Sequence, residues 1–393
     1  NGEIYNFKQI RKKLEKKGYS FNSSGDTEVL LKGYQEWGKN ILNELNGMFT
    51  FALWDQKLKK LFLARDRYGI KPVYYIVQNN KFIFASEIKA IIASKLIRKK
   101  LDKEGLIEYF TFQNFFTDKT LFKDIKILEA GCYLEIENNK IKFQRYWDFT
   151  FQETIKIKKE NEYLEELQFL FNRAVNRQLV SDVDIGSYLS GGMDSGSITA
   201  LASKKIDKLR TFTCGFDLNS VSGIELNFDE RETAEKISYL FKTEQYEMVL
   251  KSGDMERSLP KLSYYLEEPR VGQSYPNFYI SGLASKFNKV VLSGTGGDEI
   301  FAGYPWRYMM SFDGSNFDQF IDEYYKVWQR LIPNKEIKNF FSPIWNEVSN
   351  VWTRDIFANV FKNVDKDLTN KNNLINLSLY LEAKTFLHSL FVV

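Results

Sequence analysis

The chain has 393 residues, of which 44% are hydrophobic and 27% are charged, so it is long enough for two or three domains with large cores. Its net charge of +4 comes from 55 basic and 51 acidic residues and gives no electrostatic reason to expect a nucleic-acid partner. No apolar run is long enough to cross a bilayer, so we expect no membrane partner either.

The first part of the chain is predicted to be an α+β domain with mainly antiparallel strands. A basic amphipathic helix is expected from Phe7 to Lys17, ended by Gly18, and a second from Glu28 to Leu45, interrupted near Gly38. Strands are predicted at 48–54, 61–65, 73–78 and 82–86, and further short strands between 121 and 147, with short helices at 87–94 and 106–116. The dipeptide Asn79-Asn80 is typical of a hairpin turn.

A polar, charged segment from Asp148 to Lys159 is predicted to separate two domains, residues 1–152 and residues 160–393. The second domain is expected to begin with an amphipathic helix from Asn161 to Leu179. Its apolar face is predicted to carry Leu164, Leu167, Phe171, Ala174 and Val175.

From Val183 onward, strands and helices are predicted to alternate. The expected strands cover 183–189, 209–216, 245–250 and 289–292, and the expected helices cover 196–205, 230–241, 252–266 and 275–287. This alternation is typical of a parallel sheet covered on both faces. After Trp306 the chain is aromatic and helical, with breaks expected at Pro333 and Pro343.

Cysteine and histidine usage excludes several kinds of site. Cys132 and Cys214 lie in strand-like runs, which is typical of neither a disulfide framework nor a zinc cluster and fits a reducing compartment, for which we expect the cytoplasm. The single histidine, His388, lies in an apolar helical pattern, so neither a Ser-His-Asp triad nor a histidine-rich metal site is expected.

The most informative motif is Ser190-Gly191-Gly192-Met193-Asp194-Ser195, which lies between a predicted strand and a predicted helix. Paired glycines allow a tight turn whose N–H groups face one point, and the start of a helix adds free N–H groups and a positive dipole end. The hydroxyls of Ser190 and Ser195 can donate further hydrogen bonds. Asp194 would repel a phosphate directly, so its presence suggests a bridging Mg²⁺. An ordinary turn between a strand and a helix is the competing interpretation.

A second glycine-rich, acidic segment, Ser293-Gly294-Thr295-Gly296-Gly297-Asp298-Glu299, follows the predicted strand at 289–292. Ligands of open parallel sheets bind at the carboxyl ends of the strands. We therefore expect Asp194 and Asp298 to face one metal-bound triphosphate from two sides.

Several motifs, in order along nearly the whole chain, resemble the family of glutamine-hydrolysing asparagine synthetases. Those similar to its glutaminase half are Asn1–Asn6, Ser24–Glu28, Ala64–Pro72 and Phe84–Ala90, and those similar to its ATP pyrophosphatase half are Ser190–Ser195 and Ser293–Tyr304. The resemblance implies an Ntn-type class II glutamine amidotransferase domain without its first strands. It also implies a doubly wound α/β domain like those of adenine nucleotide alpha hydrolases, and truncation of the chain at both ends.

The resemblance implies roles for residues of the first part. Asn1 and Gly2 match the oxyanion hole, which holds the alkoxide formed when a thiolate attacks the glutamine amide. Glu3 and Asp26 match positions that bind the α-amino group of glutamine. Asp26 precedes a predicted helix, so a helix cap is its alternative role. Arg65 and Asp66 lie in the matching segment Ala64–Pro72, and a structural ion pair is the alternative to a functional role for them.

In the second part, the resemblance implies an ATP site and the chemistry of amide synthesis. Ser190, Gly191, Gly192, Asp194, Ser195 and Gly294 match the pyrophosphate site, and Asp194 and Asp298 match its Mg²⁺ ligands. The acceptor carboxylate attacks the α-phosphorus of ATP, pyrophosphate leaves, and ammonia from glutamine displaces AMP from the acyl-adenylate. With aspartate as acceptor the product is asparagine. A homodimer is a further expectation.

Three departures from the family pattern qualify this expectation. The nucleophilic cysteine of the family lies upstream of the Asn-Gly-Glu motif, and Cys132 and Cys214 lie too deep in the sequence to replace it, so this chain is expected to lack glutaminase activity. The catalytic lysine of the family follows the last residue present. Thr295 stands where well-known members carry an acidic residue near the acceptor, and threonine is no carboxylate base.

These departures leave two alternatives open. The first is an amidotransferase of the same architecture that acts on another carboxylate, for example that of a sugar acid. The second is an inactive nucleotide-binding fragment.

Overall fold

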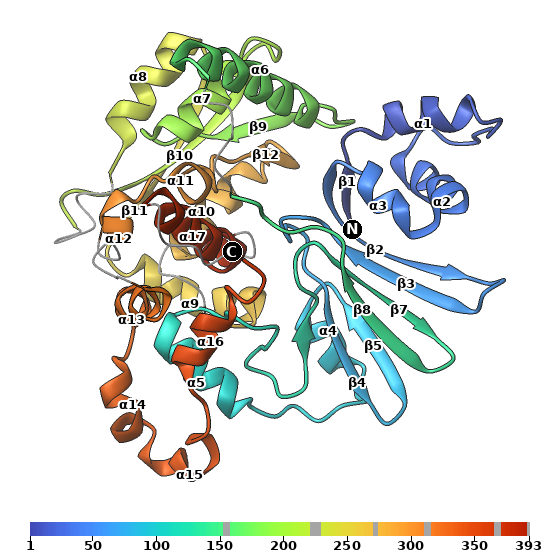
Figure 1. Cartoon of the computed structure of the whole chain (residues 1–393). Coiled ribbons are helices and arrows are strands. Elements are labelled where there is room, and N and C mark those ends of the chain that lie inside the picture. Colours follow the sequence, from blue (N-terminus) through green and yellow to red (C-terminus); the bar gives the residue numbers. More distant parts are fainter. Residues whose placement is uncertain (152–157, 221–228, 270–273, 310–315, 365–370, 391–393) are drawn as a thin grey trace. The chain divides into compact units, whose positions relative to one another are not determined.

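The structure is a computed structural model that describes residues 1–151, 158–220, 229–269, 274–309, 316–364 and 371–390 (Figure 1). The chain forms two compact units. One contains Asn1–Glu153 together with Glu299–Val392, and the other contains Thr154–Asp298. The predicted boundary segment, 148–159, falls partly outside the described residues.

A five-stranded antiparallel sheet forms the centre of the N-terminal part. Its order is β1-β2-β3-β7-β8, and its strands are β1 (Gly2–Ile4), β2 (Gly47–Asp55), β3 (Lys60–Arg65), β7 (Cys132–Glu137) and β8 (Lys140–Arg145). The predicted antiparallel α+β character of this part is thus confirmed.

A second, three-stranded antiparallel sheet has the order β5-β4-β6, with β4 (Tyr74–Gln78), β5 (Lys81–Ala85) and β6 (Lys126–Ile127). The hairpin predicted at Asn79-Asn80 joins β4 to β5. Both asparagines have a left-handed backbone, with φ of 52° and 57°, as a two-residue turn of this kind requires.

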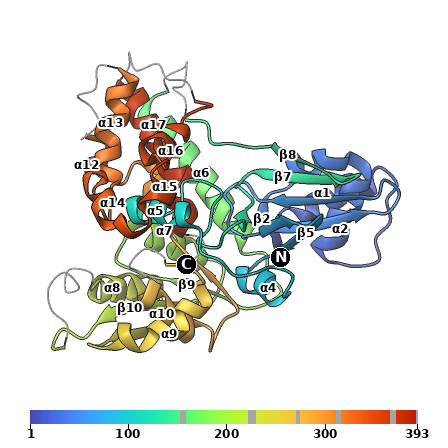
Figure 2. The same cartoon turned by 90° about the horizontal axis from the view of Figure 1, so that it is seen from below.

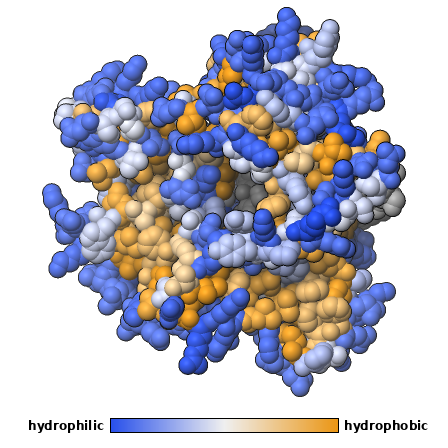
Figure 3. All heavy atoms as spheres, turned by 180° about the vertical axis from the view of Figure 1, so that it is seen from behind, coloured by the Kyte–Doolittle hydropathy of each residue, from blue (hydrophilic) through white to orange (hydrophobic). Residues whose placement is uncertain are grey.

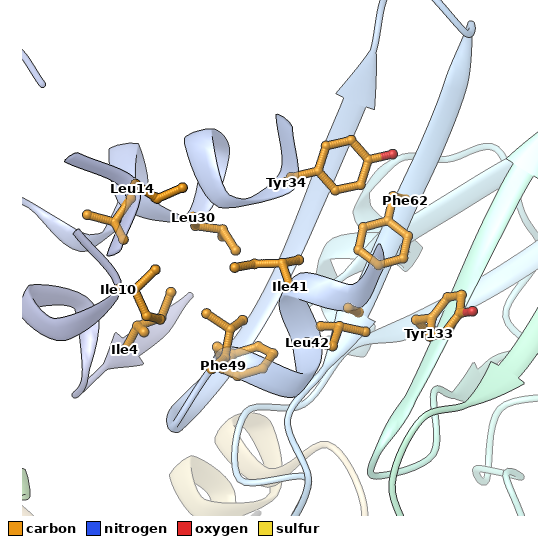
Figure 4. Packing of buried hydrophobic residues seen from close by; sticks show 13 residues of the cluster. Ile4, Ile10, Leu14, Leu30, Tyr34, Ile41, Leu42, Phe49, Phe62 and Tyr133 are labelled. Atoms are coloured by element: carbon orange, nitrogen blue, oxygen red, sulfur yellow. The ribbon is translucent and has the colours of Figure 1, made fainter. Parts of the chain in front are cut away.

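Three helices cover one face of the five-stranded sheet, namely α1 (Phe7–Glu15), α2 (Asp26–Trp37) and α3 (Ile41–Glu44). The 3-10 turn η1 (Gly38–Asn40) separates α2 from α3, so it interrupts the second predicted helix near Gly38 as expected. Figure 4 shows their apolar side chains meeting those of the strands. Ile10 and Leu14 of α1, four residues apart on one face, are fully buried, as is Phe62 of β3. Burial of each such side chain contributes about 1.5–3 kcal/mol to stability.

Helix α4 (Ile88–Ala93) follows β5, and helix α5 (Lys103–Phe112) begins and ends several residues before the predicted limits. The Asp102 carboxylate caps α5 by accepting from the N–H of Gly105 at 2.8 Å, and Gln113 ends it in a left-handed conformation. In both Figure 1 and Figure 2, α5 lies among the C-terminal helices α14 (Asn334–Phe340), α15 (Trp345–Val348) and α16 (Thr353–Asn359).

The remaining helices of this unit are α12 (Pro305–Met309), α13 (Phe317–Trp328), α17 (Lys371–Lys384) and α18 (Phe386–Leu390). Aromatic side chains of α13, of α16 and of the segment after α16 form a buried core, including Phe320, Trp328, Phe357 and Phe361. The predicted breaks are confirmed, because Pro333 precedes the first residue of α14 and Pro343 lies in the 3-10 turn η3 (Ser342–Ile344).

The other unit contains a four-stranded, wholly parallel sheet with the order β11-β10-β9-β12. Its strands are β9 (Ile185–Tyr188), β10 (Arg210–Phe216), β11 (Glu244–Leu250) and β12 (Val290–Leu292). Figure 1 shows α7 (Met193–Ala202) and α8 (Arg231–Phe241) on one face, and α9 (Asp254–Leu266) and α10 (Ser274–Ala284) on the other. The predicted doubly wound parallel sheet is confirmed.

Helix α6 (Glu160–Gln178) forms as predicted and packs against α7, but most of its predicted apolar face is exposed. Val175 is buried, whereas Leu164 and Leu167 are 55% and 46% exposed.

Hydrophobic residues also reach the surface in patches among charged ones in the view of Figure 3. In the described part of the chain, no helix has the length and apolar character needed to cross a membrane.

Candidate functional site

The order of the parallel strands brings the two glycine-rich loops together. From β9 the chain passes through α7 to β10 on one side and through α8 to β11, and it later returns to the opposite side of β9 as β12. The strands that follow β9 are added on one side of it, whereas β12 is added on the other side, where Leu292 is in register with Ser187. The order in which the chain adds strands to the sheet therefore reverses between β9 and β12, although all four strands are parallel. Loops that leave two strands at such a reversal border one crevice. The loops after Tyr188 and Leu292 are the two that the sequence singles out.

The loop after β9 is held in shape by its own hydroxyl groups. The Ser195 hydroxyl accepts from the N–H of Ser190 at 3.0 Å and lies 2.9 Å from the Ser190 hydroxyl oxygen, which accepts from the N–H of Gly192 at 3.1 Å. Gly192 immediately precedes α7, whose first turn contains Asp194. The serine hydroxyls thus close the turn that directs the first N–H groups of α7 outward.

Gly191 occupies a position that has no room for a side chain. A β-carbon there would lie 2.9 Å from the Thr233 β-carbon of α8. Its N–H donates to the Glu230 carboxylate at 3.2 Å. An anionic oxygen thus already binds an N–H group of this loop. Sequence reasoning did not find Glu230, because no local pattern connects it to a loop 39 residues earlier.

The second loop packs its backbone directly on Asp194 and Ser195. A β-carbon on Gly294 would lie 2.8 Å from the Ser195 backbone nitrogen, and one on Gly297 would lie 2.4 Å from the Asp194 carboxyl carbon. Glycine at 294 is therefore required for the loop backbones to approach this closely, and glycine at 297 leaves room for the Asp194 carboxylate in its present position. Gly297 begins helix α11 (Gly297–Phe301) and was not among the predicted ATP-site residues.

Thr295 lies in the same loop and is exposed. Its hydroxyl oxygen is 2.8 Å from that of Ser293, and the Ser293 hydroxyl also accepts from the N–H of Thr295 at 3.3 Å. The family pattern assigns position 295 to the neighbourhood of the acceptor. In this chain Thr295 and its neighbour Ser293 thus place two neutral hydroxyl groups there.

The two carboxylates of this site interact electrostatically. Burial raises the pKa of Asp194, and the negative charge of Asp298 raises it further. In the part of the chain that the structure describes, neither carboxylate forms an ion pair with a lysine or arginine, and no cluster of three or more His, Cys, Asp or Glu side chains could hold a metal. Two carboxylates with no cationic partner suit Mg²⁺, which commonly takes one or two carboxylates and completes its shell with phosphate and water.

The predicted glutamine-site residues meet at the start of the chain. Gly2 has φ of +121°, and a β-carbon on it would lie 2.0 Å from the Met48 carbonyl oxygen, so only glycine fits. The Asp26 carboxylate accepts from the N–H of Ile4 at 3.0 Å, and it belongs to the first turn of α2, whose cap position is Gly25. Asp26 therefore anchors β1 to α2.

Asn1 and Glu3 lie on either side of Gly2 and are exposed. The Asn1 carbonyl accepts from the N–H of Thr50 at 2.8 Å, and this bond fixes the start of the chain on β2. Glu3 contributes to raising the pKa of Tyr5 to about 12, after the larger effect of burial. The structure thus places Asn1 just before β1, Gly2 and Glu3 in β1, and the Asp26 carboxylate against Ile4, the last residue of this strand.

Arg65 and Asp66 are both fully buried, and backbone groups surround both side chains. The Arg65 guanidinium donates to the carbonyls of Lys71, Leu128 and Gly69 at 2.9, 2.6 and 2.5 Å. The Asp66 carboxylate accepts from four N–H groups at 3.0–3.2 Å, those of Phe49, Tyr68, Ile70 and Lys71. Arg65 and Asp66 thus each shape the loop after β3 through bonds to backbone groups.

Comparison with known proteins agrees with the order of these sites. Residues 1–147 match the family model of the glutamine amidotransferase domain, and residues 166–393, more than half of the chain, match that of asparagine synthase. Asparagine synthetase [glutamine-hydrolyzing] 3 of Bacillus subtilis (strain 168) is 34% identical over 361 residues, which cover 86% of this chain and 57% of that protein.

A second relative, asparagine synthetase [glutamine-hydrolyzing] 1 of the same organism, is 34% identical over 306 residues, which cover 77% of this chain and 47% of that protein. The chain thus spans about half the length of the curated relatives it matches. The chain belongs to the asparagine synthase family and carries a glutamine amidotransferase domain before its asparagine synthase region.

Proposed function

We propose that this chain is part of an enzyme that makes asparagine from aspartate, with ATP as the energy source and glutamine as the source of ammonia. In this reaction an oxygen of the acceptor carboxylate bonds to the α-phosphorus of ATP, and pyrophosphate leaves. Ammonia then bonds to the acyl carbon, AMP leaves with the carboxylate oxygen, and a proton is released. The family membership and the printed names of the relatives support this proposal.

One observation carries the nucleotide half of the proposal, namely the close approach of the loop at Gly294–Gly297 to Asp194 and Ser195. It supports a single crevice with N–H groups from one loop and carboxylates from both. Phosphate groups would bind at the positive end of α7, to the N–H groups of its first turn, because the N–H groups of Ser190, Gly191 and Gly192 already donate to other acceptors.

Mg²⁺ is the metal that the family implies, and the donor set fits it. Asp194 and Asp298 would hold the ion, which when bound offsets the negative charge of the phosphates and orients them. The loop at Gly294–Gly297 keeps the Asp194 side chain in place through direct contact, and burial keeps water from part of its surface.

For the glutamine half, we propose that the Asn1 amide and the Gly2 N–H stabilise the oxyanion, and that Glu3 and Asp26 bind the α-amino group. One Asp26 oxygen accepts from Ile4, so it anchors the strand that carries the other three residues. Release of ammonia belongs to the whole protein, since the chain spans about half the length of its relatives.

We also propose that the functional division lies between residues 1–152 and 160–393, and that the enzyme works in the cytoplasm. The limits of the two family models, 147 and 166, support this division. Cys132 and Cys214 are both free thiols, as a reducing compartment requires.

Calorimetric titration of ATP into this chain, with and without Mg²⁺, tests the nucleotide site. We expect Asp194→Asn to weaken Mg²⁺-dependent binding on the order of tenfold or more, because the ion loses a charged ligand. Asp184→Asn is the matched control, because Asp184 precedes the amino end of the same strand, β9, and its side chain is 80% exposed. Equal affinities of folded wild-type protein and the Asp194→Asn variant would contradict the proposed site.

Amide formation by the whole protein tests the acceptor. We expect aspartate to be amidated with formation of AMP and pyrophosphate. A whole protein that is inactive with aspartate and active with another carboxylic acid would instead show that the neutral Ser293–Thr295 pair belongs to a different acceptor site.

A further inference from the structure

A hollow of about 460 Å³ lies in the N-terminal part, far along the sequence from both predicted sites. Three segments line it: the end of β4 and the following turn with Gln78 and Asn79, the segment 95–100 after α4, and residues 123–124 before β6. Its volume falls in the range of roughly 300–1,000 Å³ that small-molecule sites have.

The floor of the hollow is part of a packed core. Ile76 of β4 is buried, and Ile97 packs on the same cluster, which also contains Ile88, Ile91 and Ile125. Because these side chains are fixed by their neighbours, the floor of the hollow keeps its shape without a ligand.

The walls of the hollow carry a strong excess of positive charge. Its lining includes the four cations Lys95, Arg98, Lys100 and Lys123 and one carboxylate, Asp124, which leaves a local charge of +3 (four minus one). Among the described residues, none of the four cations forms an ion pair.

Three lysines close in sequence to the hollow, but outside its lining, form ion pairs. Lys103 binds Glu347, Lys119 binds Glu104, and Lys126 binds Asp118 at 2.9 Å. Among the described residues, the four cations that line the hollow have no such carboxylate partners, so their charge is available to a ligand.

We propose that this hollow binds an anion with two or more linked phosphate groups. A local charge of +3 exceeds what one carboxylate or one phosphate can neutralise, whereas a phosphate chain carries several charges a few ångströms apart. The lysine ammonium groups bind phosphate as point charges, and the Arg98 guanidinium can bind two oxygens of one phosphate. The source of the chain is either an inorganic polyphosphate or a nucleoside di- or triphosphate.

This site is independent of the proposed ATP site, because it shares no residue with the loops at Ser190–Ser195 and Ser293–Asp298. Methyl NMR separates the two. Ile76 and Ile97 line the hollow, while Ile300 lies in α11, two residues after Asp298 of the proposed ATP site. In magnesium-free buffer, tripolyphosphate should shift the Ile76 and Ile97 methyl signals saturably. Shifts confined to Ile300, or no saturable shift, would overturn the proposal.

Charge removal tests the role of the four cations. We expect K95Q/R98Q/K100Q/K123Q to weaken tripolyphosphate binding on the order of tenfold or more. The matched control, K57Q/K59Q/K140Q/K142Q, removes the same charge from exposed lysines of the same domain that do not line this hollow, and we expect it to change the affinity less than about twofold. Equal weakening by both variants would show a general charge effect and overturn the proposal.

Competing ligands test the chemistry and the source of the anion. AMP and citrate should bind on the order of tenfold more weakly than tripolyphosphate. Equal binding by either would overturn the assignment to linked phosphates. If ATP and tripolyphosphate bind equally tightly, the phosphate chain alone accounts for binding, and an inorganic polyphosphate is the favoured ligand. If ATP binds more tightly, as measured at Ile76 and Ile97, the favoured ligand is a nucleotide that also contacts Gln78 or Asn79.

Discussion

The carboxyl carbon of Asp194 lies 2.4 Å from the point that a β-carbon of Gly297 would occupy. The first residue of α11 is thus in direct contact with the side chain in the first turn of α7. Glycine is needed at position 297 because of this neighbour. Its φ is not among the left-handed values of the chain, so backbone conformation is not the reason.

The first prediction concerns Gly297→Ala. The new methyl group would meet only the end of a flexible side chain, so the Asp194 carboxylate should turn away while the backbone stays in place. We expect the free energy of unfolding to change by less than about 1 kcal/mol. Mg²⁺-dependent ATP affinity should fall on the order of tenfold, because the carboxylate leaves its position. Thermal unfolding and calorimetric titration measure the two effects.

Gly282→Ala is the matched control for this substitution, because a β-carbon on Gly282 of α10 would meet nothing within 4 Å. In a helix this change should stabilise the protein by roughly 0.5–1 kcal/mol and leave ATP binding unchanged. Undiminished ATP affinity in Gly297→Ala would show that the contact between the loops has no part in binding.

Gly294→Ala should behave differently from Gly297→Ala. Its β-carbon would lie 2.8 Å from the Ser195 backbone nitrogen and 3.1 Å from the Asp194 β-carbon, and neither atom can move without the start of α7. We expect a loss of about 1–3 kcal/mol in stability, the usual cost of overpacking. A lower midpoint of thermal unfolding than in Gly297→Ala checks this order, and the reverse order would contradict the steric account.

The meeting of the two loops could be predicted from the sequence, but the contact that joins them could not. Parallel strands place their following loops at one edge of a sheet, so two acidic glycine-rich loops after two strands had to face the same edge. The requirement for glycine at 297 depends on the position of one distant side chain, Asp194, which no periodicity records. For the same reason Glu230 was not foreseen as a partner of the Gly191 N–H.

The elements were predictable wherever a local rule determines them. Asn79-Asn80 forms its hairpin because asparagine tolerates the left-handed conformation. Pro333 lies immediately before α14, where a helix cannot extend toward the N-terminus without the N–H that proline lacks. Burial was less predictable. The apolar pattern of α6 specified a helix but not its neighbours, and Leu164 on that face is exposed.

The next prediction concerns the anchor between β1 and α2. Asp26→Ala removes the acceptor of the Ile4 N–H and a negative charge from the first turn of α2, so it should cost about 1–3 kcal/mol. Asp26→Asn retains an acceptor oxygen and should cost about half as much or less. Hydrogen exchange at Ile4 measures the local effect, and unchanged protection in Asp26→Ala would contradict the anchoring role.

Arg65→Lys should be strongly destabilising although it preserves the charge. The guanidinium donates to three carbonyls from inside the protein, and a lysine ammonium cannot span the same positions, so at least one acceptor and a buried charge lose their partners. We expect a cost of roughly 3–5 kcal/mol. Arg11→Lys is the control, because Arg11 forms a partly exposed pair with Glu15, and its loss should cost less than about 1 kcal/mol. Similar urea midpoints for both variants would contradict this account.

Glu108 gives the protein a predictable pH dependence. Its carboxyl is fully buried in α5 and accepts from the Thr117 N–H and hydroxyl, both at 2.8 Å, and burial raises its pKa to about 7 despite these bonds. The pKa of Glu108 in the unfolded chain has its ordinary value of about 4.3. At pH values between about 4.3 and 7, the folded state therefore holds a proton that the unfolded state has lost. The contribution of Glu108 to the free energy of unfolding is fully present below pH 4.3 and falls by a total on the order of 3 kcal/mol as the pH rises to about 7. Glu108→Gln keeps an acceptor oxygen and cannot ionise, so its stability relative to the wild type should increase from pH 5 to pH 8. Parallel curves of thermal midpoint against pH for the two proteins would show that Glu108 titrates normally.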